Sequence, residues 1–184
     1  MSERPGADFV GDPVGWLRER TPWLLAPELG TCLVGTQALA IACRREGLAP
    51  PTPHDIDLAW APDVEQGARL LEEHGVAMAS TDGNLARGTL AMKVDGQRLE
   101  ITTFRAANKD APIQQRIVED LRERDMTVGA LAVQLTDGTL HDPCDGLADY
   151  RARRIVAAGD PADRVREHPV RWVRYFRKAW EWGF

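Results

Sequence analysis

Cysteine and extended hydrophobic runs are scarce in this sequence. Only Cys32, Cys43 and Cys144 occur among 184 residues, without a Cys-x-x-Cys spacing, which argues against both a disulfide framework and a zinc ribbon. No apolar run approaches the roughly 18 residues of a membrane span. The first five residues also lack the basic-then-apolar pattern of a signal peptide. These absences predict a soluble, cytoplasmic protein that does not enter a membrane.

Basic residues are also fewer than acidic ones. The 23 lysines and arginines are outnumbered by 28 acidic residues, which gives a formal net charge of -5. Proteins that grip nucleic-acid backbones over a long footprint are usually basic on that face, so this balance lowers the expectation of an extended tRNA or DNA surface. A local basic patch remains compatible with it. His74 and His141 show no metal-ligand spacing, and zinc is therefore not expected.

Helical and extended segments alternate along the chain, which indicates an α/β (α+β) fold with a mixed, mostly antiparallel sheet flanked by helices. The dipeptide Asp95-Gly96 between two apolar runs predicts a β-hairpin, and Asp137-Gly138 predicts a second one. Helices are expected over 12–19, 36–45, 63–74, 117–133 and 169–182. Strands are expected over 31–34, 55–60, 76–79, 86–94 and 97–103.

The motif Asp55-Ile56-Asp57 carries the clearest chemical signal. On a strand, residues two apart project from the same face, so both carboxylates point the same way and form a clamp for a metal ion. Upstream, Gly35-Thr36 stands between a short apolar strand and a helix. Backbone N–H groups at such a helix start suit an anionic phosphate. Phosphate beside metal suggests nucleotide chemistry.

The predicted last helix, 169–182, has an apolar stripe and a basic stripe. We expect one face to pack inward, because its apolar residues recur at helical spacing: Trp172, Val173, Phe176, Ala179 and Trp180. Arg174, Arg177 and Lys178 lie off that stripe, as either a phosphate-facing row or a solvated face.

A series of motifs in the second half of the chain resembles one known family. It comprises residues 99–105, residues 120–132, Asp142-Pro143 with Asp145-Gly146, and residues 167–171. In order and spacing this series is similar to the head domain of bacterial CCA-adding enzymes and poly(A) polymerases, within the polymerase-beta-like nucleotidyltransferase superfamily. The similarity covers about residues 31 to 184.

The resemblance implies a nucleotidyltransferase that moves an NMP from an NTP, ATP or CTP, with Mg²⁺ or Mn²⁺ as cofactor. Residues 1–184 would form one head domain, with a catalytic core over 31–160 and the start of a helical neck over 161–184. Asp55, Asp57 and Glu100 would be the catalytic and metal-binding residues. The nucleotide would be bound by Gly35, Thr36, Arg124, Asp125, His168, Arg171 and Arg174.

Several departures from the family pattern affect what the chain is expected to act on. His168 replaces the carboxylate of the family's Glu-Asp-x-x-Arg base-reading motif, which leaves the base open. Thr36 replaces a second glycine, and the sequence ends at Phe184, where CCA-adding enzymes continue into tRNA-binding domains. A small-molecule acceptor, or one presented by a partner, is therefore expected. The alternatives are tRNA 3′-end addition together with other chains, and a non-catalytic nucleotide-binding or antitoxin-like module.

Overall fold

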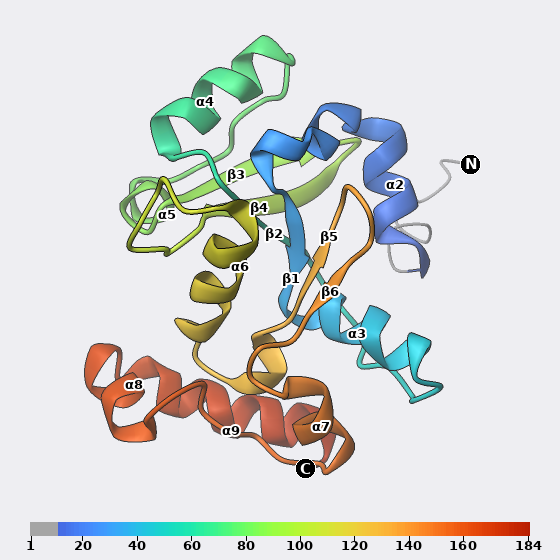
Figure 1. Ribbon diagram of the computed structural model, residues 1–184, viewed down its shortest axis with the longest axis vertical. Helices are drawn as coiled ribbons and strands as arrows, with labels where there is room; N and C mark the ends of the chain where they lie inside the picture. The colour runs from blue at the N-terminus through green and yellow to red at the C-terminus, as the bar shows by residue number, and fades with distance from the viewer. Residues whose placement is uncertain (1–10) are drawn as a thin grey trace.

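A six-stranded sheet forms the centre of the computed structural model, which describes residues 11–184 (Figure 1). The strand order is β3-β4-β2-β1-β5-β6. Strands β2 and β4 run parallel, and the other neighbouring pairs are antiparallel. The strands are β1 (Cys32–Val34), β2 (Ile56–Trp60), β3 (Thr89–Val94), β4 (Gln97–Thr103), β5 (Ala132–Gln134) and β6 (Leu140–His141). The expected mixed, mostly antiparallel sheet and both predicted hairpins are confirmed.

Helices surround this sheet. They are α2 (Pro13–Arg20), α3 (Gly35–Arg45), α4 (Val64–Glu73), α5 (Asp82–Ala86), α6 (Ile113–Arg122), α7 (Gly146–Arg151), α8 (Pro161–Glu167) and α9 (Val170–Trp182). Short 3₁₀ turns lie at η1 (Pro22–Leu25), η2 (Pro27–Leu29) and η3 (Thr127–Gly129). In Figure 1, α7, α8 and α9 gather at one end of the sheet. Within residues 11–184, no helix combines the length and apolar character that a bilayer crossing requires.

Alternation along the central strands separates two packed faces. Leu33 and Leu58 join the larger hydrophobic core, whereas Cys32 and Ala59 join a smaller core that includes residues of α6. Because residues two apart on a strand share a face, Asp57 projects on the same side as Ala59. The register of β2 thus directs the second carboxylate of the motif toward the side covered by α6.

One predicted helix extends too far along the chain. The helix expected over 117–133 ends at Arg122, because Val133 and Ala132 pair with Leu33 and Val34 in the sheet. These residues are buried on both faces of a central strand, so their apolar run carries no strand periodicity.

The segment before β3 also differs from expectation. The strand predicted over 76–79 is reduced to an isolated bridge between Met78 and Met92. Strand β3 begins at Thr89 instead of residue 86, because Asp82–Ala86 forms helix α5. The Thr81 side chain caps that helix in a capping box with Asn84, a signal that the apolar pattern alone does not carry.

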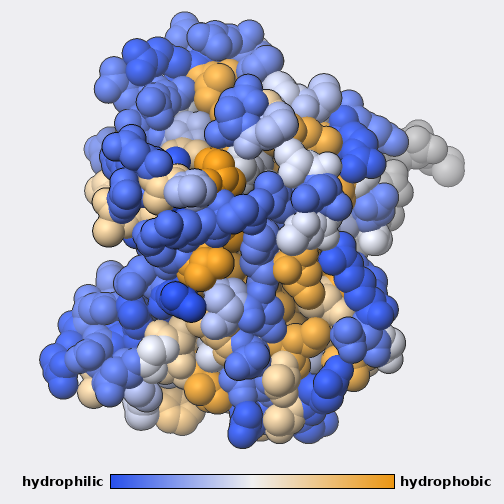
Figure 2. Space-filling view, viewed as in Figure 1, coloured by the Kyte–Doolittle hydropathy of each residue, from blue (hydrophilic) through white to orange (hydrophobic). Residues whose placement is uncertain are grey.

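The residues of α9 that pack on the core are not the predicted ones. Trp172, Val173, Phe176 and Trp180 are exposed, Trp180 by 90 %. Tyr175 and Trp182 are the partly buried residues that contact the core instead. Figure 2 shows hydrophilic residues over most of one face of the molecule, broken by separate groups of hydrophobic ones.

Candidate nucleotide and metal site

Asp55 and Asp57 lie where β2 begins, beside the first turn of α3. Asp55 immediately precedes the strand and Asp57 is its second residue. Both line a cavity of about 200 Å³ together with Gly35 and Thr36. The structure therefore brings together the two motifs that the sequence places twenty residues apart.

Electrostatics make this carboxylate pair receptive to a cation. Burial, and next the charge of Asp55, raise the pKa of Asp57 to about 6. Within residues 11–184, neither carboxylate forms a hydrogen bond or direct ion pair with another residue. Two adjacent carboxylates without a bonded counter-ion are the oxygen donors that Mg²⁺ and Mn²⁺ prefer. Asp55 and Asp57 therefore fit the divalent ion implied by the resemblance.

Gly35 shapes the opposite wall of the cavity. Its φ of +66° lies in the left-handed region, and a β-carbon built there would lie 3.8 Å from Asp57 Oδ2. Helix α3 starts at Gly35 without a side-chain cap, so the first-turn N–H groups stay available to an anion. Glycine permits both the turn and a close approach of backbone to ligand.

Glu100 lies next to Asp57 across the parallel pair β2–β4, in direct register. Its carboxylate accepts a hydrogen bond from Arg98 Nη2 at 2.7 Å. Among residues 11–184, no cluster of three or more His, Cys, Asp or Glu side chains is preassembled to hold a metal. The role of Glu100 as a third ligand therefore stays a prediction.

Arg124 is held at the C-terminal end of α6 by a buried carboxylate. Its Nη2 donates to Asp120 Oδ2 at 3.0 Å, while Asp120 Oδ1 accepts from the backbone N–H of Arg105 at 3.1 Å. Asp120 is 1 % exposed. One buried acid thus fixes Arg124 at the cavity wall and positions the start of the chain segment after β4.

Asp125 connects the end of α6 to α9. Its Oδ2 accepts from Arg174 Nε at 2.6 Å, and its backbone carbonyl accepts from Tyr175 Oη at 2.7 Å. Arg124 and Asp125 therefore have different partners, because Arg124 bonds Asp120 and Asp125 bonds Arg174. Arg174, Arg177 and Lys178 all line the cavity that holds Asp55, which favours the phosphate-facing row over the solvated face.

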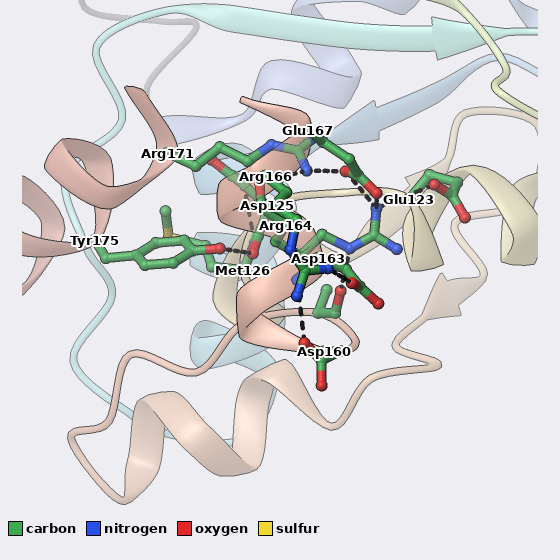
Figure 3. Close-up of polar contacts among 11 residues, drawn as sticks. Glu123, Asp125, Met126, Asp160, Asp163, Arg164, Arg166, Glu167, Arg171 and Tyr175 are labelled. Atoms are coloured by element: carbon green, nitrogen blue, oxygen red, sulfur yellow. Dashed lines mark hydrogen bonds and ion pairs between the residues drawn. The ribbon is translucent and has the colours of Figure 1, made fainter. Parts of the chain in front are cut away.

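Glu167, the last residue of α8, bonds arginines of both α8 and α9 (Figure 3). It lies between Arg164, whose Nη1 donates to Oε2 at 3.0 Å, and Arg171, which forms an ion pair with the same oxygen. The hydrogen bond from Arg171 lowers the pKa of Glu167. Arg164 also bonds Glu123 at 3.1 Å, which ties α8 to the end of α6.

His168 and Arg171 line a second groove of about 370 Å³. This groove shares Arg124, Asp125 and Arg174 with the cavity at Asp55, so the two spaces are adjoining. Sequence reasoning missed Arg87 and Arg105, which also line the groove. No local pattern links two arginines eighteen positions apart, and only the β3–β4 pairing brings them to one place.

Comparisons with known proteins show which family the sequence resembles. Residues 42–156 match the family model described as the poly(A) polymerase head domain. The CCA-adding enzyme of Levilactobacillus brevis is 32 % identical over 139 residues, which is 71 % of this chain and 33 % of that protein. The CCA-adding enzyme of Limosilactobacillus fermentum is 33 % identical over 150 residues, 77 % of this chain and 36 % of that protein.

Solved structures show the same fold. The Bacillus stearothermophilus CCA-adding enzyme in complex with CTP aligns with a TM-score of 0.66 at 24 % identity, over 95 % of this chain and 39 % of that one. A tRNA-processing enzyme with CTP aligns with a TM-score of 0.62 at 26 % identity, over 93 % of this chain and 42 % of that one. The chain spans about a third of the length of the curated relatives that it matches. Because the family model covers more than half of the sequence, the chain belongs to the poly(A) polymerase head-domain family.

Proposed function

We propose that this chain is the catalytic head of a metal-dependent nucleotidyltransferase that adds nucleotides to the 3′ end of tRNA. The observation that carries the proposal is the meeting of Asp55 and Asp57 with the Gly35-Thr36 helix start in one cavity. A carboxylate clamp beside unsatisfied N–H groups matches an NTP whose phosphates require both a cation and hydrogen-bond donors.

In the proposed reaction, the acceptor hydroxyl oxygen attacks the α-phosphorus of the NTP, the bond to pyrophosphate breaks, and the hydroxyl proton is released. Gly35 and Thr36 would hold the leaving phosphates. Arg174, Arg177 and Lys178 would add positive charge along the same wall. Asp55 and Asp57 would hold the divalent ion, which when bound stabilises negative charge on the attacking and leaving oxygens.

The comparisons change which acceptor we prefer. They do not support a small-molecule acceptor, because the similar curated proteins are CCA-adding enzymes. One similar structure, at 25 % identity, is a tRNA nucleotidyltransferase complexed with a primer tRNA and an incoming ATP analog. These relatives favour the tRNA alternative, with CTP and ATP as the nucleotides to test first.

The proposal is tested by incubating the purified chain with Mg²⁺, each radiolabelled NTP, and tRNA transcripts that lack the final A, CA or CCA. We expect template-independent incorporation that Asp55→Ala abolishes and that Glu72→Ala, an exposed carboxylate on α4, leaves intact. A parallel arm replaces tRNA with a pool of small metabolites. Pyrophosphate release with metabolites alone would overturn the tRNA assignment. NTP binding without turnover on any acceptor would favour a non-catalytic module.

A further inference from the structure

Five arginines line the second groove, and only some of them are paired with a carboxylate. Three have a carboxylate partner: Arg124 bonds Asp120, Arg171 bonds Glu167, and Arg174 bonds Asp125. The other two are Arg87 and Arg105. Within residues 11–184, neither of their guanidinium groups forms a hydrogen bond or an ion pair. The guanidinium groups of Arg87 and Arg105 are therefore available to bind an external anion.

The fold brings these two arginines together through the β3–β4 hairpin. Thr89 pairs with Thr102, so Arg87 just before β3 and Arg105 just after β4 emerge at the same end of the hairpin. Thr103 N–H donates to the Gly88 carbonyl at 2.9 Å, which extends the ladder toward them. The backbone N–H of Arg105 is fixed by Asp120. The hydrogen bonds fix both backbones before any ligand arrives.

The surroundings of Arg105 are unfavourable for a lone cation. Arg105 is an exposed residue, but partial desolvation of its guanidinium group lowers its pKa; repulsion from Arg124 and Arg171 lowers this pKa further, while Asp120 and Asp125 raise it. Among the described residues that line the groove, Asp125 is the one carboxylate, and it is already bonded to Arg174. His168 adds ring nitrogens but no fixed negative charge. A ligand that carries negative charge would relieve this repulsion.

We propose that Arg87 and Arg105 form a phosphate-binding subsite beside the candidate nucleotide cavity. A phosphate group presents several acceptor oxygens, and a guanidinium group can donate to two of them in parallel. The phosphate belongs either to the triphosphate of an NTP or to the phosphodiester backbone of the acceptor RNA. Both sources rest on the proposed function, whereas the binding of phosphate itself does not depend on turnover.

Two binding measurements separate these sources. Calorimetry with inorganic tripolyphosphate and with CTP measures the nucleotide arm in the absence of any acceptor. Fluorescence anisotropy with a labelled oligonucleotide that copies a tRNA 3′ strand, at several salt concentrations, measures the RNA arm. We expect Arg87→Ala and Arg105→Ala each to weaken binding about tenfold in one arm. If RNA is the source, each variant also reduces the slope of log K against log salt by about 0.7.

Matched variants keep the test specific. Arg87→Lys and Arg105→Lys retain the charge but lose the fork, and are expected to recover only part of the affinity. Arg69→Ala, an exposed arginine on α4 that pairs with Glu65, controls for net charge. Circular dichroism melting checks that each variant is folded. Unchanged affinity of both alanine variants in both arms would overturn the subsite, as would equal losses in Arg69→Ala. Tight phosphate binding without nucleotide addition would overturn the proposed function and leave the subsite standing.

Discussion

Gly35 faces the Asp57 carboxylate, and a β-carbon at residue 35 would lie in van der Waals contact with Asp57 Oδ2, at 3.8 Å. The proposed phosphate-binding turn and the proposed metal clamp therefore border the same cavity. A φ of +66° at Gly35 gives a reason for glycine at this position.

Gly35→Ala should impair nucleotide binding beyond its effect on stability. The left-handed φ makes alanine unfavourable by about 1 kcal/mol, and the methyl group enters the space beside Asp57. Gly47→Ala is the matched control, because Gly47 has a φ of +68° at the other end of α3 and open space around its β-carbon position. Thermal melts should fall in both variants, while CTP titration should show weakened affinity only in Gly35→Ala. Equal CTP affinity in the two variants would contradict this role of the turn.

Asp57→Asn should stabilise the metal-free protein above pH 6. The folded-state pKa of Asp57, about 6, lies above the ordinary 3.8, so the folded chain holds this proton more tightly than the unfolded chain does. Stability is therefore lost as pH rises from about 4 to 6, and the amide removes that loss, on the order of 3 kcal/mol.

Chemical denaturation at pH 4 and pH 7.5 in EDTA measures this effect. The D57N variant should equal the wild type at pH 4 and exceed it at pH 7.5, with Glu72→Gln unchanged at both. Lower stability of D57N at pH 7.5 would show that the Asp57 carboxylate is not destabilised by desolvation and by Asp55.

The sequence was most informative where local chemistry decides the structure. Asp95-Gly96 predicts its hairpin, and the spacing of Asp55 and Asp57 places both carboxylates on one wall. Prediction from the sequence failed where pairing between distant segments determines the structure. Ala132 and Val133 form a strand because they pair with β1. The face of α9 was mistaken for a related reason, since Tyr175 bonds Asp125, fifty residues away.

The Arg174–Asp125 ion pair should contribute to the docking of α9. Arg174 is 51 % exposed but Asp125 only 14 %, so screening is incomplete and a coupling energy of about 0.5–1 kcal/mol is expected. A double-mutant cycle with Arg174→Ala and Asp125→Ala, read by urea unfolding, measures it. The pair Arg151–Glu46, exposed by 56 % and 54 %, should give a coupling near zero in the same cycle. Equal couplings for the two pairs would argue against this docking role.

His168→Asp should change which base is used. A carboxylate is an obligatory acceptor for the exocyclic amines of cytosine and adenine, whereas a histidine ring can donate or accept. We expect the ratio of CTP and ATP to UTP and GTP incorporation to rise in the variant. His74→Asp, which lines neither cavity, serves as the control. An unchanged ratio would place His168 outside base selection.

Metal-dependent nucleotide binding at Asp55 and Asp57 is the central claim, and Mn²⁺ titration followed by electron paramagnetic resonance tests it most directly. In the presence of CTP, the wild-type chain should bind Mn²⁺ more tightly than in its absence, and Asp55→Ala and Asp57→Ala should abolish that gain. Glu72→Ala should retain it. Mn²⁺ affinity that is indifferent to CTP, or equal in the wild type and both aspartate variants, would contradict the account.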